Sequence, residues 1–177
     1  MTTALANDRL LKRFQKWDAD ADGQLEREDF TEEAAKIAHA FGKAPDAREV
    51  QALRDAFDSL YNYLAREAGV PSGGAISQDA FLRVTGNLIY QGGEANFNRA
   101  LGPVVKAIIG ICDKNADGKI NAEEFEAWMA GIGVNRSEAR EAFTQVDTNG
   151  DGELSLNELL AAVRDYHFGR LDVELLG

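Results

Sequence analysis

Residues 147–158 decide the fold, and they read DTNGDGELSLNE. Two other twelve-residue stretches repeat the pattern: residues 18–29 read DADADGQLERED, and residues 113–124 read DKNADGKINAEE. Each stretch has Asp first, Asp or Asn third, Asp fifth, Gly sixth, an aliphatic residue eighth and an acid twelfth. Side-chain oxygens therefore recur at alternate positions around a glycine, which permits a backbone reversal that a Cβ would resist.

This spacing is the calcium-loop pattern of the EF-hand. Calcium prefers about six to eight oxygens at about 2.3–2.6 Å, and alternate side chains of a tightly wound loop supply them. The seventh residue contributes its backbone carbonyl, and the twelfth carboxylate reaches back from the following helix. One such loop is a weak signal because Asp-Gly turns are common, but three full matches with helical flanks are a strong one. We therefore expect three calcium sites.

The acidity of the chain lies in these loops. The 177 residues include 30 Asp and Glu against 19 Lys and Arg, a formal net charge of −11. The three loops hold 14 acidic and 3 basic residues, and the remaining 141 residues hold 16 of each. Such a balance disfavours nucleic acid and anionic membranes as partners. No apolar run approaches the roughly 18–20 residues that cross a bilayer.

A fourth stretch, residues 69–80, reads GVPSGGAISQDA. It keeps Gly74 sixth and Ile76 eighth, but its first, third, fifth and twelfth positions carry no acid. Apolar residues at helical spacing flank it, as they flank the other three loops. We expect a degenerate unit that binds no metal and serves as scaffold. Paired loops would then meet at their eighth positions, Leu25 with Ile76 and Ile120 with Leu154.

The predicted fold is all-α: four helix-loop-helix units of the EF-hand type, in two pairs that form one compact globule. The N-terminal pair spans residues 1–91 and the C-terminal pair residues 92–177, joined near Gln91-Gly92-Gly93. Pro103 lies within the helix before the loop 113–124 and should break or kink it. Residues 168–177 carry Phe168, Leu171, Val173, Leu175 and Leu176, so we expect this tail to pack on the body.

The sequence does not predict an enzyme. His39 and His167 fall at helical positions without a catalytic motif around them, and no Gly-rich phosphate loop follows a strand. Cys112 is the single cysteine and cannot form an internal disulfide, which fits a reducing, cytoplasmic compartment. Its apolar neighbours predict a small buried residue.

Taken together, these features resemble the sarcoplasmic calcium-binding proteins and their bacterial relatives over essentially the whole chain. The segments CDKNADG (112–118), QVDTNGDGELSLNELL (145–160) and HFGRLDVELLG (167–177) carry the resemblance. It implies a compact helical fold, three metal sites, no catalysis and calcium buffering. By motif position it also implies the ligands, with the seventh residue acting through its backbone oxygen. They are Asp18, Asp20, Asp22, Gln24 and Asp29 in the first loop; Asp113, Asn115, Asp117, Lys119 and Glu124 in the third unit; and Asp147, Asn149, Asp151, Glu153 and Glu158 in the fourth.

The three sites should differ. Asp29 is one methylene shorter than Glu124 and Glu158, which lowers the oxygen count of the first site towards the six that Mg²⁺ prefers. We expect this site to tolerate Mg²⁺ better than the others. Calcium ions are the expected ligand, and the chain is expected to be a monomer.

Two functions remain open: an intracellular calcium buffer, or a calcium sensor that exposes an apolar surface and regulates a partner protein. Sensors commonly expose a Met-rich groove, and Met129 is the only methionine here besides Met1. The apolar tail could also plug such a groove. Both features favour the buffer.

Overall fold

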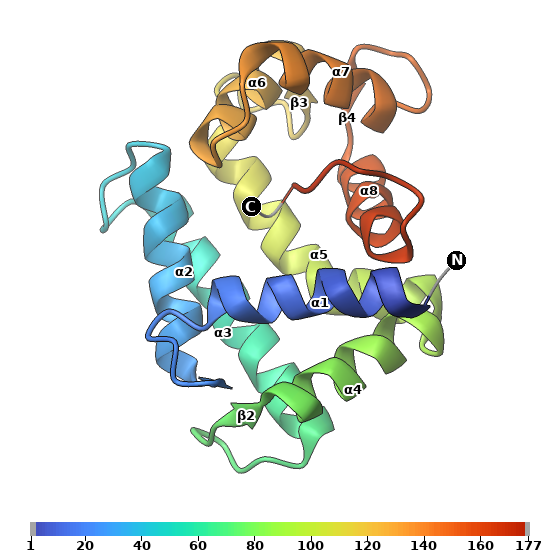
Figure 1. The fold of residues 1–177 in the computed structure, drawn as a ribbon. Coiled ribbons are helices and arrows are strands. Elements are labelled where there is room, and N and C mark those ends of the chain that lie inside the picture. The colour runs from blue at the N-terminus through green and yellow to red at the C-terminus, as the bar shows by residue number, and fades with distance from the viewer. Residues whose placement is uncertain (1–2, 176–177) are drawn as a thin grey trace.

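Eight helices and four short strands follow one another in the computed structural model, which describes residues 3–175, with side chains from Asn7 onward (Figure 1). In the first half the elements are α1 Thr3–Trp17, β1 Gln24–Leu25, α2 Arg27–Ala40, α3 Arg48–Ala68, β2 Ile76–Ser77 and α4 Gln78–Tyr90. In the second half they are α5 Gly93–Cys112, β3 Ile120–Asn121, α6 Ala122–Gly131, α7 Arg136–Val146, β4 Glu153–Leu154 and α8 Leu156–Phe168. The predicted all-α fold of four helix-loop-helix units is confirmed.

The loops meet in pairs, as predicted. β1 runs antiparallel to β2, with Leu25 opposite Ile76, and β3 runs antiparallel to β4, with Ile120 opposite Leu154. All four of these aliphatic side chains are completely buried. Each two-residue ladder therefore satisfies backbone groups that the loops would otherwise leave unpaired, and it anchors two loops to one core.

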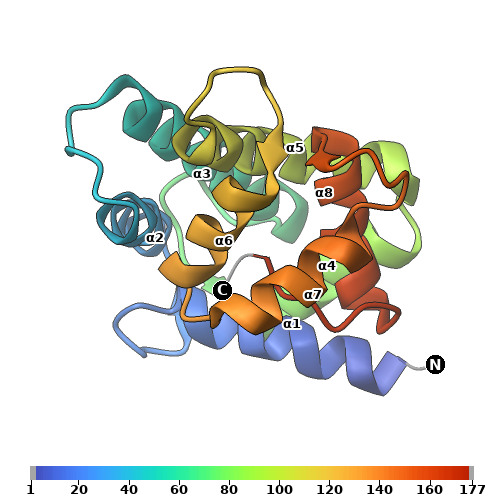
Figure 2. The same ribbon diagram turned by 90° about the horizontal axis from the view of Figure 1, so that it is seen from above.

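Aromatic residues from α1, α2, α3 and α4 fill the core of the first half. The ring of Trp17 packs against Phe30, Phe57 and Phe81, with centroids 5.3–6.1 Å apart. The second half adds a smaller group in which Phe125 contacts Trp128 and Phe143. The two halves share one hydrophobic core because α3 packs along α5, and α1 contacts both α4 and α8 (Figures 1 and 2).

The C-terminal tail packs on the body, as expected. Beyond α8 the chain turns back and runs between α1, α6 and α7 (Figures 1 and 2), where Val173 and Leu175 are buried in the common core. Leu176 lies outside the described residues. Within residues 3–175, no helix is both long and apolar enough to cross a lipid bilayer.

Two local features differ from simple expectation. Of the break or kink expected at Pro103, the break does not occur: α5 continues through this residue, and its neighbours Val104 and Val105 are buried in the core and hold the helix in place. In the degenerate loop Gly69 and Gly73 take the left-handed conformation, and the sixth-position Gly74 does not. Gly74 instead allows a close approach, since a Cβ there would lie 2.5 Å from the Val70 side chain.

Candidate metal centres

Three clusters of carboxylates form where the repeated pattern predicts them. They consist of Asp18, Asp20 and Asp29 in the first loop, Asp113, Asp117 and Glu124 in the third unit, and Asp147, Asp151 and Glu158 in the fourth. Within each cluster, one oxygen from every residue lies within 4.8 Å of the others. The residues come from the loop and from the helix after it, so each helix-loop-helix unit builds its own cluster.

The first carboxylate of each loop shapes the backbone reversal. Gly23 N donates to Asp18 Oδ2 over 2.9 Å, Gly118 N to Asp113 Oδ2 over 2.7 Å, and Gly152 N to Asp147 Oδ2 over 3.0 Å. These glycines have φ between 78° and 83°, in the left-handed region that favours glycine. The three loops therefore share one backbone shape, which the degenerate loop lacks.

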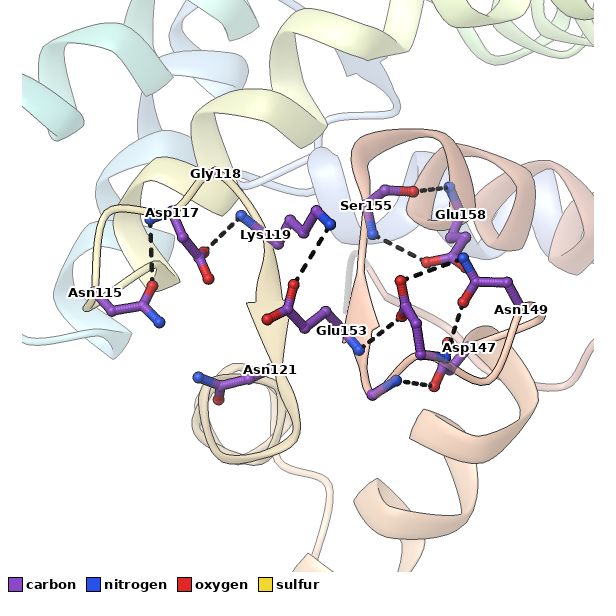
Figure 3. A network of polar contacts seen from close by, with 12 residues as sticks. Asn115, Asp117, Gly118, Lys119, Asn121, Asp147, Asn149, Glu153, Ser155 and Glu158 are labelled. Carbon is purple, nitrogen blue, oxygen red and sulfur yellow. Dashed lines mark hydrogen bonds and ion pairs between the residues drawn. The ribbon is translucent and has the colours of Figure 1, made fainter.

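The third and fifth residues turn their side chains inward in the same way. Asp20, Asn115 and Asn149 each accept a hydrogen bond from the backbone N–H of the fifth residue, at 3.1–3.3 Å. Asp22, Asp117 and Asp151 each accept one from the seventh, at 2.9 Å. Figure 3 shows this arrangement in the third and fourth units. The loops thus hold their oxygens inward through their own backbone amides.

The twelfth residue is positioned by a helix cap. Asp29, Glu124 and Glu158 each stand in the first turn of a helix and accept a hydrogen bond from the backbone N–H of the ninth residue, at 2.8–3.0 Å. At α6 and α8 the capping is reciprocal, because Asn121 and Ser155 accept from the N–H of Glu124 and Glu158, whereas at α2 the Asp29 N–H bonds the backbone carbonyl of Glu26. In the degenerate loop Ala80 occupies the equivalent position, where its N–H still bonds Ser77 Oγ at 3.1 Å. That loop keeps half of the cap and loses the carboxylate.

Backbone amides of the second position hold two of these carboxylates from the other side. Ala19 N donates to Asp29 Oδ1 over 3.1 Å, and Lys114 N donates to Glu124 Oε2 over 2.6 Å. Asp29, although shorter, therefore spans the same two attachment points as Glu124. Both side chains are buried between their loop and helix.

The seventh residues of the paired loops face each other. Lys119 Nζ and Glu153 Oε2 form an ion pair at 3.5 Å across the β3–β4 ladder (Figure 3). The Lys119 side chain therefore points towards Glu153 and not into its own loop. Its backbone carbonyl oxygen remains as the ligand that a cation could use. The remaining predicted residue of this kind, Gln24, lies exposed in β1.

Electrostatics favour a cation at these clusters. Desolvation raises the pKa of Asp20 and Asp29, and the neighbouring carboxylate of Asp22 raises both further. In the fourth unit, Asp147 Oδ1 and Glu158 Oε1 are buried and have no hydrogen-bond partner within the described part of the chain. Buried anionic oxygens without a donor are costly, and a divalent ion bound by both would remove that cost. The residues therefore fit a calcium ion, a hard cation that takes oxygen ligands.

The first loop differs at its fifth position. Asp22 turns inward like Asp117 and Asp151, but its carboxylate is not one of the three that form the first cluster. We did not predict that the twelfth residue also caps a helix. The ninth residue of the loop is Asn121 in the third unit and Ser155 in the fourth, and both are typical N-caps. An N-cap followed three residues later by Glu is the signal that could have indicated this role.

These loops and their paired geometry define a class of EF-hand protein. Residues 138–166 match the family described as EF hand domain, and residues 106–130 match the EF hand family. A solved calcium-binding protein of Streptomyces coelicolor superposes with a TM-score of 0.71 and is 26% identical, covering 91% of this chain and 97% of that one. Renilla reniformis luciferin-binding protein is 27% identical over 165 residues, which are 91% of this chain and 85% of that protein.

The similarity to one bacterial protein is far higher. Calerythrin of Saccharopolyspora erythraea is 64% identical over 177 residues, covering all of both chains. The chain therefore belongs to the calerythrin family of EF-hand calcium-binding proteins. The resemblance that its motifs indicated is confirmed.

Proposed function

We propose that the chain binds three calcium ions, one at each acidic loop, and acts as a calcium buffer inside the cell, with no catalytic activity. The observation that carries the proposal is the convergence of three carboxylates in each of three loops. The ligands would be those predicted by motif position, with the N-terminal half (residues 1–91) holding one ion and the C-terminal half (residues 92–177) holding two. Residues 69–80 would hold the first loop in place without binding metal.

A calcium titration of metal-free protein by calorimetry tests the stoichiometry. We expect three ions per chain, and two for each of the variants Asp29→Asn, Glu124→Gln and Glu158→Gln. Glu123→Gln is the matched control, because Glu123 is exposed and lies beside Glu124 without joining the cluster. A parent chain that binds fewer than three ions, or a control that loses one, would contradict the assignment.

The closed surface supports buffering over sensing. Met129 and Trp128 of α6 are buried, and the tail contacts this helix through the hydrogen bond from Trp128 to Leu175. Among the described residues, Tyr90 is the only large hydrophobic side chain that is exposed, at 41%. A buffer with this surface should bind less of an apolar-surface dye when calcium is added, because the loops close and the core consolidates.

A sensor is the alternative function. The Streptomyces coelicolor relative is described in connection with prokaryotic calcium-mediated regulation, and regulation requires a surface that calcium alters. A large calcium-dependent rise in dye fluorescence would favour this alternative over the buffer. Measuring the dye in the presence of Mg²⁺ keeps the comparison close to cellular conditions.

The first site should discriminate least between Ca²⁺ and Mg²⁺. Asp29 makes the same two backbone hydrogen bonds as Glu124, so the difference lies in its shorter side chain, which favours a single oxygen on the metal. Fewer oxygens suit the octahedral Mg²⁺ ion. The variant Asp29→Glu should therefore raise the preference of this site for Ca²⁺ over Mg²⁺, as measured by competition calorimetry. An unchanged preference would defeat the explanation.

A further inference from the structure

The C-terminal tail lies in a groove that two buried arginines of α1 line. Arg9 donates to the carbonyl of Leu171 at 2.9 Å and also bonds the carbonyl of Tyr166 and the carboxylate of Asp172. Arg13 donates to Glu174 Oε1 at 2.7 Å. Both arginines are buried although they carry charge, so their position depends on the carboxylates and carbonyls that face them.

The tail alternates in character along this groove. Val173 and Leu175 are buried in the core. The acids that alternate with them form ion pairs, Asp172 with Arg9 and Glu174 with Arg13. On the far side, Trp128 Nε1 of α6 donates to the carbonyl of Leu175 at 2.9 Å. Tyr166, whose ring lies under Arg9, also donates its hydroxyl to Glu174 Oε2 at 3.2 Å.

Side chains hold the tail, and no backbone ladder does. Within the described residues, no backbone–backbone hydrogen bond involves residues 172–175. On the other side of the tail, Met129 of α6, Val134 of the turn after it and Ala142 of α7 line a pocket together with Asp172, Val173 and Glu174 of the tail. The arginines therefore accept the acidic side chains of the tail, and the core accepts its apolar ones.

We propose that this groove is a recognition surface for an extended segment in which acidic and apolar residues alternate, and that the tail is its intramolecular occupant. A partner protein that presents such a segment would bind by displacing residues 171–175. Because the tail is tethered, it competes at a high effective concentration. The intact chain should therefore bind such a segment only weakly. This interaction goes beyond calcium binding and does not depend on whether the protein is a buffer or a sensor.

The test uses a fluorescent peptide with the sequence of residues 170–177, RLDVELLG, and the calcium-saturated chain truncated after Gly169. Fluorescence anisotropy should show saturable binding to the truncated chain and at least about tenfold weaker binding to the intact chain, because the tethered tail competes. A peptide with Lys in place of both acids should bind the truncated chain at least about tenfold more weakly, because it places cations where Arg9 and Arg13 now meet carboxylates.

Two further measurements keep the proposal falsifiable if truncation impairs folding. A protease site inserted between Gly169 and Arg170 can be cut after calcium is bound, and the helical circular dichroism signal then shows whether the fold persists. The variant Arg13→Gln in the cut chain should weaken peptide binding, whereas the control Arg140→Gln, an exposed arginine on α7 paired with Glu126, should not.

Three results would overturn the proposal. A folded, cut chain that binds the native and the lysine peptide equally would show that charge is not read. Equal binding to intact and truncated chains would place the peptide outside the groove. A dimer of the intact chain that disappears on truncation would assign the groove to the tail of a second copy. The calcium stoichiometry is measured separately, so failure here leaves that proposal standing.

Discussion

His167 on α8 should make the folded state sensitive to mild acid. Its side chain is 6% exposed and Nδ1 donates to the carbonyl of Val163 at 2.8 Å. The ring also lines a cavity of about 40 Å³ with Leu10 and Trp17. Burial, with a smaller contribution from the positive charges of Arg13 and Arg9, lowers its pKa from the ordinary 6.5 to about 4. Protonation therefore requires a charge in an apolar interior beside two cations.

The sign and size of the effect follow from this pKa. Because the folded chain holds the proton more weakly than the unfolded chain, the stability present above pH 6.5 is lost as the pH falls towards 4. The full loss is about 3 kcal/mol, and about 2 kcal/mol of it is reached by pH 5.0.

The assay is urea unfolding of calcium-saturated protein at pH 7.5 and pH 5.0, compared between the parent and His167→Gln. The variant should lose about 2 kcal/mol less than the parent over this interval, whatever its stability at pH 7.5. His39→Gln is the control, since His39 is exposed on α2, and it should behave like the parent. Equal losses in the parent and in His167→Gln would refute the assignment of acid sensitivity to this buried ring.

Three further outcomes are expected. Tyr61→Phe should lower the free energy of unfolding by about 1 kcal/mol, because the Tyr61 hydroxyl donates to Gly74 O at 2.5 Å and ties down the degenerate loop; an exposed control, Tyr90→Phe, should change it little in the same urea titration. Cys112 should resist thiol reagents in the folded, calcium-bound chain and react on unfolding, because burial raises its pKa to about 12; rapid labelling of the folded chain would contradict this. Removing calcium with a chelator should lower the melting temperature by at least about 5 °C, since one site at a hundredfold excess of free ion is worth about 2.7 kcal/mol; an unchanged melting temperature in calorimetry would show that metal binding and folding are not coupled.

Local chemistry explains why so much of the metal centres could be read from the chain. The first, third and fifth residues bond amides only two to five residues away, so the twelve-residue pattern contains nearly all the contacts that shape each loop. The pairing of Leu25 with Ile76 followed as well, because helix-loop-helix units have one way to join their eighth positions. The departure of Asp22 from the first cluster was not readable, since the motif places Asp at the fifth position of all three loops.

The degenerate loop and α5 show where local rules fail. Gly73 takes the left-handed conformation, and Tyr61 of the preceding helix α3 bonds the carbonyl of Gly74, so this loop departs from the shape of the other three. Pro103 should interrupt a helix by local rules, yet α5 is continuous, with α3 and α8 packed along it. In α5, packing against helices distant in sequence outweighs a preference of neighbouring residues.

The sequence by itself determined the class of fold, the number of acidic loops and the location of the net charge, because a calcium loop is a local structure of twelve residues. Only the tertiary structure decided which surface the tail covers, because Arg9 and Arg13 meet Asp172 and Glu174 across more than 160 residues of chain. It also decided that His167 is enclosed, since α1 and α5 close over a ring that is otherwise on one helix face. Long-range packing sets the environment of a side chain, and the environment sets its chemistry.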